Sequence, residues 1–251
     1  MTYSTPLEQF EIISLLPLFH FKNIYLNITN STLFTFLNLS LVLLLFQFVN
    51  VNNRIIPTRW QSILEEVFLF SKSLVEKNIG PAHLQYFPFI FFLFSFLTIS
   101  NLIGLIPYSF TITSHIFITF GLALSLFIGI NIIAIKKHKL HFLGFFLPHG
   151  IHLALAPLLV PIEIASYLSR VFSLSIRLFA NMMSGHTLLK IIAGFAWTML
   201  SFGGIWYFLQ LFPLVIIIAV TVLELGIAIL QAYVFTILIC LYLNGAITLE
   251  H

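Results

Sequence analysis

The sequence contains no aspartate, and charge of either sign is scarce. Its 251 residues carry 8 acidic side chains, all of them glutamate, and 11 lysines or arginines, so charged residues make up only 8% of the chain. A soluble domain usually carries about 25% charged residues, which it needs to cover its surface. With 60% hydrophobic residues and a mean hydropathy of +1.07, the chain is predicted to be a polytopic membrane protein.

Cysteine is nearly absent, which excludes further classes of structure. Because Cys240 is the one cysteine, no internal disulfide framework and no multi-cysteine metal site is possible. His149 and His152 have the i, i+3 spacing that lets two histidines bind one metal ion. No third ligand accompanies them in the sequence, so we expect no metal site. The sequence also lacks a Gly-Lys-Ser/Thr phosphate loop, and we expect neither a nucleotide site nor a cofactor.

The hydrophobic residues fall into runs that predict a single membrane domain over 1–251. A helix needs about 20 apolar residues to cross a bilayer, and two of the runs are much longer, so those helices must tilt, kink or divide. Pro157, Pro161 and Pro213 are expected to interrupt them. The predicted parts are a lead-in over 1–32, a transmembrane helix over 33–51, an amphipathic surface helix over 55–80, a transmembrane hairpin over 86–135, and long helices over 150–200 and 205–247.

The basic residues predict the orientation of the chain. Arg54 and Arg59 precede the hairpin, and the run Lys136-Lys137-His138-Lys139 follows it, so both groups lie on one side of the membrane. The positive-inside rule makes that side the cytoplasm or the matrix. The net charge of +3 comes from such loops and helix ends rather than from a basic stripe, so nucleic acid is not an expected partner.

A stripe of polar residues follows one face of the first long helix. When Ser169 is left out, the spacings between successive polar residues from Glu163 to Ser184 are 3, 4, 3, 4, 4 and 3. This repeat keeps their side chains on one helix face over about 30 Å. Packing between helices would explain the serines and the asparagine, and Arg170 is open to a structural or an interfacial role. The stripe comprises Glu163, Ser166, Ser169, Arg170, Ser173, Arg177, Asn181 and Ser184.

Packing between helices does not account for Arg177, because a buried arginine is a permanent positive charge that needs a counter-charge. Glu163 is 14 residues earlier, about 21 Å along the axis, so the counter-charge must come from elsewhere. His186 lies on the opposite face, where a hydrogen-bonded interior histidine is one interpretation. Glu224 and Gln231 share a face of the last helix. Because histidine and a buried glutamate exchange protons and arginine does not, the set indicates proton movement.

Five segments together form a specific pattern that extends over nearly the whole chain. They are STPLEQFEI (4–12), SNLIGLIPYSF (100–110), APLLVPIEIASYLSR (156–170), SIRLFANMMSGHTLL (175–189) and LELGIAILQAYVFTIL (223–238). These segments resemble the subunit a family of F-type ATP synthases, most closely its mitochondrial form. The pairing of Gly185-His186 with Glu224 favours the mitochondrial branch of that family.

The resemblance implies an all-α membrane fold in which the last two helices form a steeply tilted hairpin against a ring of c subunits. Arg177 would be the essential cation facing that ring, with Gln231 near it. Glu163 would line a half-channel to the matrix, and His186 and Glu224 a half-channel from the intermembrane side. Asn181 is also expected on the proton path.

The same resemblance implies a setting and a set of partners. The chain would be a subunit of the proton-transporting ATP synthase complex in the mitochondrial inner membrane, without an ATP site of its own. Its partners would be the c-ring, the peripheral stalk, other membrane-sector subunits, lipid and protons. A proton-coupled secondary transporter is the alternative, although no inverted repeat supports it. A purely structural subunit is a third option, which Arg177 and Glu224 make less suitable.

Overall fold

A computed structural model describes residues 7–21, 24–51, 58–106, 109–139, 156–204 and 206–248. Over these ranges, five helical segments are long and apolar enough to cross a bilayer. The predicted fold class, an all-α membrane protein, is therefore confirmed. The five segments are Asn30–Gln47, Pro81–Gly104, Ile116–His138, Pro157–Ser201 and Leu211–Thr248.

The N-terminal part contains a short hairpin that the sequence analysis did not predict. A 3₁₀ turn, η1 (Glu8–Phe10), is followed by the antiparallel strands β1 (Ser14–Phe21) and β2 (Ile24–Thr29). Asn30 ties the segment before β1 to the start of the next helix, because its Nδ2 donates to the carbonyl of Glu11 at 3.0 Å. The hairpin leads directly into α1 (Asn30–Val51).

The chain divides into two compact units, each built from segments far apart in the sequence. The first unit comprises Met1–Phe48, Ser95–His115 and Leu178–Ala232, and the second comprises Val49–Phe94, Ile116–Arg177 and Tyr233–His251. Three helices contribute a segment to each unit: α3 (Phe87–Gly104), α5 (Ala156–Phe202) and α7 (Leu211–Thr248).

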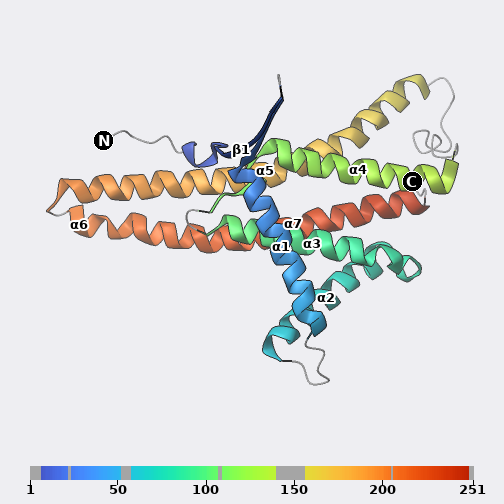
Figure 1. Ribbon diagram of the computed structural model, residues 1–251, viewed down its shortest axis with the longest axis horizontal. Helices are drawn as coiled ribbons and strands as arrows, with labels where there is room; N and C mark the ends of the chain where they lie inside the picture. Colours follow the sequence, from blue (N-terminus) through green and yellow to red (C-terminus); the bar gives the residue numbers. More distant parts are fainter. Residues whose placement is uncertain are drawn as a thin grey trace. The chain divides into compact units, whose positions relative to one another are not determined.

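Buried polar residues join the helices of the first unit. Asn38 on α1 donates to Oγ of Ser100 on α3 at 3.2 Å, and Asn101 donates to the carbonyl of Ala228 on α7 at 3.2 Å. Both asparagine side chains are almost fully buried. Hydrogen bonds of this kind hold transmembrane helices together where the hydrophobic effect supplies little. Within this unit α5 and α7 run side by side, and the short helix α6 (Trp206–Leu209) lies at the end where they connect (Figure 1).

The two long helices continue through positions where the sequence predicted an interruption. Pro157 lies in the first turn of the 47-residue α5, Pro161 lies inside this helix, and Pro213 lies in the first turn of the 38-residue α7. Proline is tolerated in a first turn because the N–H it lacks would have no intrahelical partner there. The end of α5 is instead set by Gly203 and Gly204, whose φ angles of 69° and 67° favour glycine.

Aromatic contacts organise the second unit. Its helices α2 (Arg59–Asn78) and α4 (Ile116–His138), with the turn η2 (Pro81–Tyr86), pack with the first part of α3. The ring of Phe70 on α2 lies 5.6 Å from that of Phe94 and 5.7 Å from that of Tyr233. Tyr167 on α5 donates to Asn131 on α4 at 2.9 Å.

A final short turn, η3 (Ile112–Ser114), belongs to the first unit.

Candidate functional site

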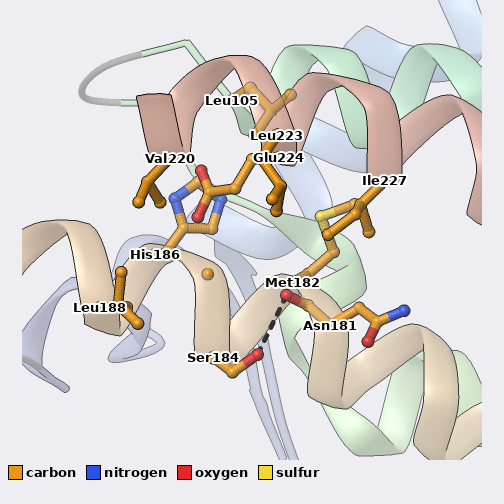
Figure 2. Close-up of a pocket in the computed structure, with 11 residues that line it drawn as sticks. Leu105, Asn181, Met182, Ser184, His186, Leu188, Val220, Leu223, Glu224 and Ile227 are labelled. Carbon is orange, nitrogen blue, oxygen red and sulfur yellow. Dashed lines mark hydrogen bonds between the residues drawn. The ribbon is translucent and has the colours of Figure 1, made fainter. Parts of the chain in front are cut away.

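A cavity of about 240 Å³ lies between α5 and α7 in the first unit. Most of its lining is apolar, as expected of a membrane-embedded helix pair. Four lining residues are polar or titratable, namely Asn181, Ser184, His186 and Glu224. In Figure 2 the His186 imidazole and the Glu224 carboxyl extend toward one another from the two helices.

The carboxyl of Glu224 is the most unusual group in this cavity, because it is both buried and unpaired. Its side chain is only 7% exposed, and neither carboxyl oxygen has a hydrogen-bond partner among the described residues. An unpaired charge at this depth is costly, so a carboxyl here favours either a proton or a mobile partner. Such a group is suited to accepting and releasing protons.

Gly185 makes the position of this carboxyl possible. A Cβ atom built on Gly185 would lie 2.9 Å from the carboxyl carbon of Glu224 and would also contact its Oε1. Real side chains do not approach a Cβ so closely. Because glycine lacks this atom, the Glu224 carboxyl packs directly against the backbone of α5.

His186 is half-buried and held from two directions within the first unit. Its Nε2 lies 3.2 Å from Oγ1 of Thr111, in the segment between α3 and α4. Phe10 of η1 packs edge-on against the ring, with the centroids 6.4 Å apart. No ion pair joins His186 and Glu224 among the described residues, and both side chains line the cavity.

Asn181 and Gln231 form a second polar contact between α5 and α7. Asn181 Nδ2 donates to Gln231 Oε1 at 3.0 Å. Gln231 is 2% exposed, and its Nε2 lacks a hydrogen-bond partner within the ranges described. The predicted residues Asn181, His186 and Glu224 therefore line one cavity, and Gln231 is bonded to one of them.

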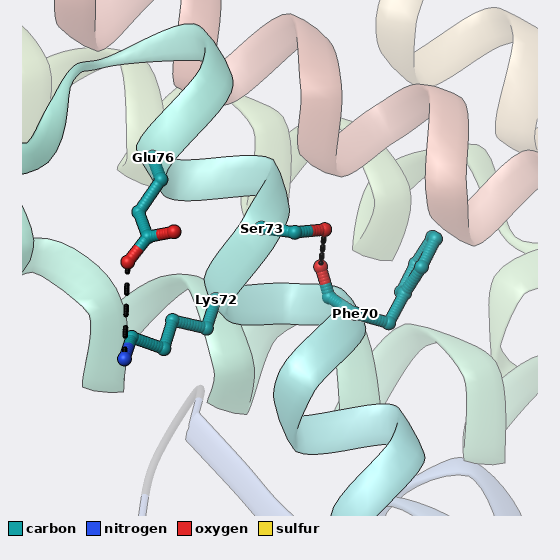
Figure 3. Close-up of polar contacts among 4 residues, drawn as sticks. All are labelled: Phe70, Lys72, Ser73 and Glu76. Carbon is teal, nitrogen blue, oxygen red and sulfur yellow. Dashed lines mark hydrogen bonds and ion pairs between the residues drawn. The ribbon is translucent and has the colours of Figure 1, made fainter.

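The predicted residues Glu163 and Arg177 belong to the second unit. Arg177 is exposed and Glu163 is half-buried. Neither side chain forms an ion pair with any described residue, whereas Lys72 and Glu76 on α2 do so at 3.8 Å (Figure 3). Arg177 therefore presents a permanent positive charge at the surface of the isolated chain.

The other arginine of the stripe has a different environment. The guanidinium carbon of Arg170 lies 5.9 Å from the ring centroid of Tyr167 and 5.7 Å from that of Tyr242. Two aromatic faces stabilise a cation and also hold it in place. This geometry supports a structural role for Arg170, one of the interpretations that the sequence left open.

Sequence reasoning missed Thr111 as a part of this site, and it used Gly185 only as part of a family motif, not for its contact with Glu224. A threonine in a loop and a glycine in a helix carry no local signal, because their importance depends on contacts with His186 and Glu224.

His149 and His152 lie outside the described residues. Among the residues that are described, no group of three or more histidine, cysteine or acidic side chains could hold a metal.

Fold and site together define a class: a multi-pass α-helical membrane protein with an imidazole and an unpaired carboxyl at one cavity between two long helices. Residues 32–244 match the model of the family described as ATP synthase A chain. The chain therefore belongs to the ATP synthase A chain family, as the sequence motifs indicated.

Individual relatives match over nearly the whole chain. The chain is 56% identical to ATP synthase subunit a of Marchantia polymorpha over 250 residues, covering 98% of this chain and 99% of the relative. It is 53% identical to ATP synthase subunit a of Chondrus crispus, with 98% and 97% covered, and 53% identical to that of Oenothera berteroana, with 100% and 91% covered.

Proposed function

We propose that this chain is the proton-conducting stator subunit of an ATP synthase membrane sector. It provides two offset half-channels to carboxyls on a rotating ring and so couples proton flow to rotation. The single observation that carries the proposal is Glu224, which is buried, unpaired and opposite His186 at a cavity. The family match supports it and does not favour the transporter alternative.

The cavity of the first unit supplies one of the two half-channels. His186 and Glu224 both change protonation readily, and the space beside them holds water-sized molecules. A proton entering there passes between the imidazole and the carboxyl and then to the ring. We assign this half-channel to the intermembrane side.

Arg177 supplies the fixed charge. A ring carboxyl crosses the lipid in its protonated form, because an ionised carboxylate there is costly. When that carboxyl meets Arg177, the cation favours the ionised form, and the proton leaves. Arg177 stays protonated, so it also blocks direct proton passage between the half-channels.

Small and exposed side chains around Arg177 support its proposed contact with the ring. Ser166, Ser169 and Ser173 on α5 are exposed, as is Arg177 itself. Such residues let another helix approach closely. Glu163, 14 residues before Arg177 on the same helix, is proposed to line the half-channel that releases protons to the matrix.

The setting that follows is the mitochondrial inner membrane, with the c-ring, the peripheral stalk and other membrane-sector subunits as partners. The chain is a multi-pass protein of an energy-transducing membrane. Each charge that crosses 100 mV releases about 2.3 kcal/mol, so several protons are needed for each ATP. We propose the two long helices, α5 and α7, as the tilted pair that follows the ring.

The replacement Glu224→Gln tests this function in the assembled enzyme. Glutamine keeps the size of the side chain but cannot ionise, so ATP-driven proton pumping into membrane vesicles should slow at least about tenfold. Glu76→Gln, which removes an exposed carboxylate from α2, is the matched control and should pump normally. Normal pumping by the Glu224→Gln enzyme at every pH would refute the proposal.

A further inference from the structure

The hydroxyl of Thr111 is the polar group that contacts the His186 imidazole directly. Thr111 Oγ1 lies 3.2 Å from His186 Nε2 and 3.3 Å from the carbonyl oxygen of Gly104, the last residue of α3. We propose that Thr111 is a positioning residue that keeps the proton of neutral His186 on Nε2 and leaves Nδ1 as the proton-exchanging nitrogen. This inference rests on the proposed function.

The count of donors and acceptors supports this assignment. A threonine hydroxyl has one hydrogen to donate and two lone pairs to accept with, whereas a carbonyl oxygen only accepts. When the hydroxyl donates its hydrogen to Gly104, the remaining contact is satisfied only if Nε2 carries the hydrogen and donates to Thr111. The other ring nitrogen, Nδ1, then has a free lone pair.

Gly104 fixes the position of the hydroxyl. A Cβ atom on Gly104 would lie 2.6 Å from Cγ2 of Thr111 and 3.1 Å from its Oγ1. Glycine therefore gives Thr111 the room to pack against the end of α3. The carbonyls in the last turn of a helix lack intrahelical partners. Ser109 Oγ also lies 3.3 Å from the Gly104 carbonyl. It lies closer to the carbonyls of Ile103 and Ile106, at 2.5 and 2.7 Å. Because a hydroxyl has one hydrogen to donate, the Gly104 carbonyl is left to Thr111.

Burial protects the contact between Thr111 and His186 from water. Thr111 is 4% exposed, and its own carbonyl accepts a hydrogen bond from Ser114 Oγ at 2.6 Å. Phe10 covers another side of the imidazole. A replacement hydrogen bond from bulk water is therefore not readily formed, and loss of the hydroxyl leaves Nε2 without its partner.

Other titratable groups surround His186, and they must be held constant in any test. Glu224 faces the imidazole from α7, and Phe10 is flanked by two acidic residues of the N-terminal segment. Among the described residues, the titratable side chains nearest to these contacts along the chain are Glu8 and Glu11 beside Phe10, His115 after Thr111, Lys190 on α5, and Glu224. None of them is altered by a substitution at Thr111.

The test is the pH profile of ATP-driven proton pumping by the assembled enzyme in membrane vesicles. Thr111→Val keeps the shape and removes the hydroxyl, so we expect the profile to shift by about half to one pH unit, the size of one net hydrogen bond. Thr111→Ser keeps the hydroxyl and should retain the original profile. Thr113→Val removes a buried hydroxyl that has no partner among the described residues, and it should also retain that profile.

A second variant reaches the same contact without removing the hydroxyl. Gly104→Ala should displace Thr111 and reproduce the shifted profile, so it decides the matter if the Thr111→Val enzyme does not assemble. The inference is overturned if Thr111→Val or an assembled Gly104→Ala enzyme keeps the original profile, or if Thr111→Ser behaves like Thr111→Val. Normal pumping by Glu224→Gln in the same series would instead overturn the proposed function itself.

Discussion

Asn181 on α5 donates a hydrogen bond to Gln231 on α7 at 3.0 Å, and the accepting side chain is 2% exposed. The contact joins the two helices that line the cavity. Since the Gln231 Nε2 already lacks a partner among the described residues, this bond is the one that satisfies its amide group. The loss of Asn181 would leave the whole amide buried and unpaired.

We therefore expect Asn181→Leu to destabilise the subunit by about 1–3 kcal/mol, the cost of an unsatisfied buried polar group. The measurement is the temperature at which the subunit is lost from the detergent-solubilised complex. Adding Gln231→Leu should recover part of this loss, because replacing both partners by apolar groups leaves nothing unsatisfied. A double variant that is less stable than Asn181→Leu would show that the two side chains act independently.

Gly185→Ala should impair proton pumping without removing any titratable group. The new methyl would occupy the space of the Glu224 carboxyl, which must then rotate away from α5. We expect pumping to fall about tenfold or more, measured by fluorescence quenching in vesicles with equal amounts of assembled enzyme.

Gly194→Ala is the control for this substitution on the same helix. Nothing lies within 4 Å of a Cβ atom built at Gly194, so the methyl meets open space. Alanine has the higher helix propensity, so this variant should gain up to about 1 kcal/mol of stability and pump normally. Equal pumping by the Gly185→Ala and Gly194→Ala enzymes would mean that the close packing of Glu224 is not needed.

These residues also show how far the sequence could predict the site. Glu224 was identified because a glutamate in an apolar run is costly. Helical spacing placed Gln231 on the same face as Glu224, and its role in the site came from the family resemblance. Periodicity is local, however, and could not predict that Thr111 reaches a histidine 75 residues away. It also could not show that Asn101 bonds the backbone of α7.

The limits of the fold prediction have a similar origin. The apolar runs predicted the long helices because burial in lipid requires continuous hydrophobic segments. The β1–β2 hairpin was missed because strand pairing depends on contacts along the backbone. The prolines were given too much weight, because Pro213 falls in a first turn, where it removes no hydrogen bond.

Glu163→Cys should react with a membrane-impermeant maleimide added from the matrix side and not from the other side. We expect this one-sided reaction because Glu163 is proposed to line the matrix half-channel and because its side chain is only half-buried. The native chain is a suitable background, because Cys240 is fully buried. Lys137→Cys, in the basic segment assigned to the matrix side, is the positive control. Labelling of the Glu163→Cys protein from the intermembrane side would contradict the proposed half-channel.

Arg177→Ala should abolish coupled ATP synthesis, with a loss of about 100-fold or more, because it removes the fixed cation that is proposed to ionise the ring carboxyl. The same variant should raise the passive proton permeability of vesicles stripped of the catalytic head, since the barrier between the half-channels is gone. Arg177→Lys should also fail to synthesise ATP, because an ammonium is more strongly hydrated and can lose its proton. Arg170→Ala is the matched control: it removes a cation held by two tyrosine rings, so it should lower stability without opening a leak. Retained ATP synthesis in the Arg177→Ala enzyme would disprove the role assigned to this residue.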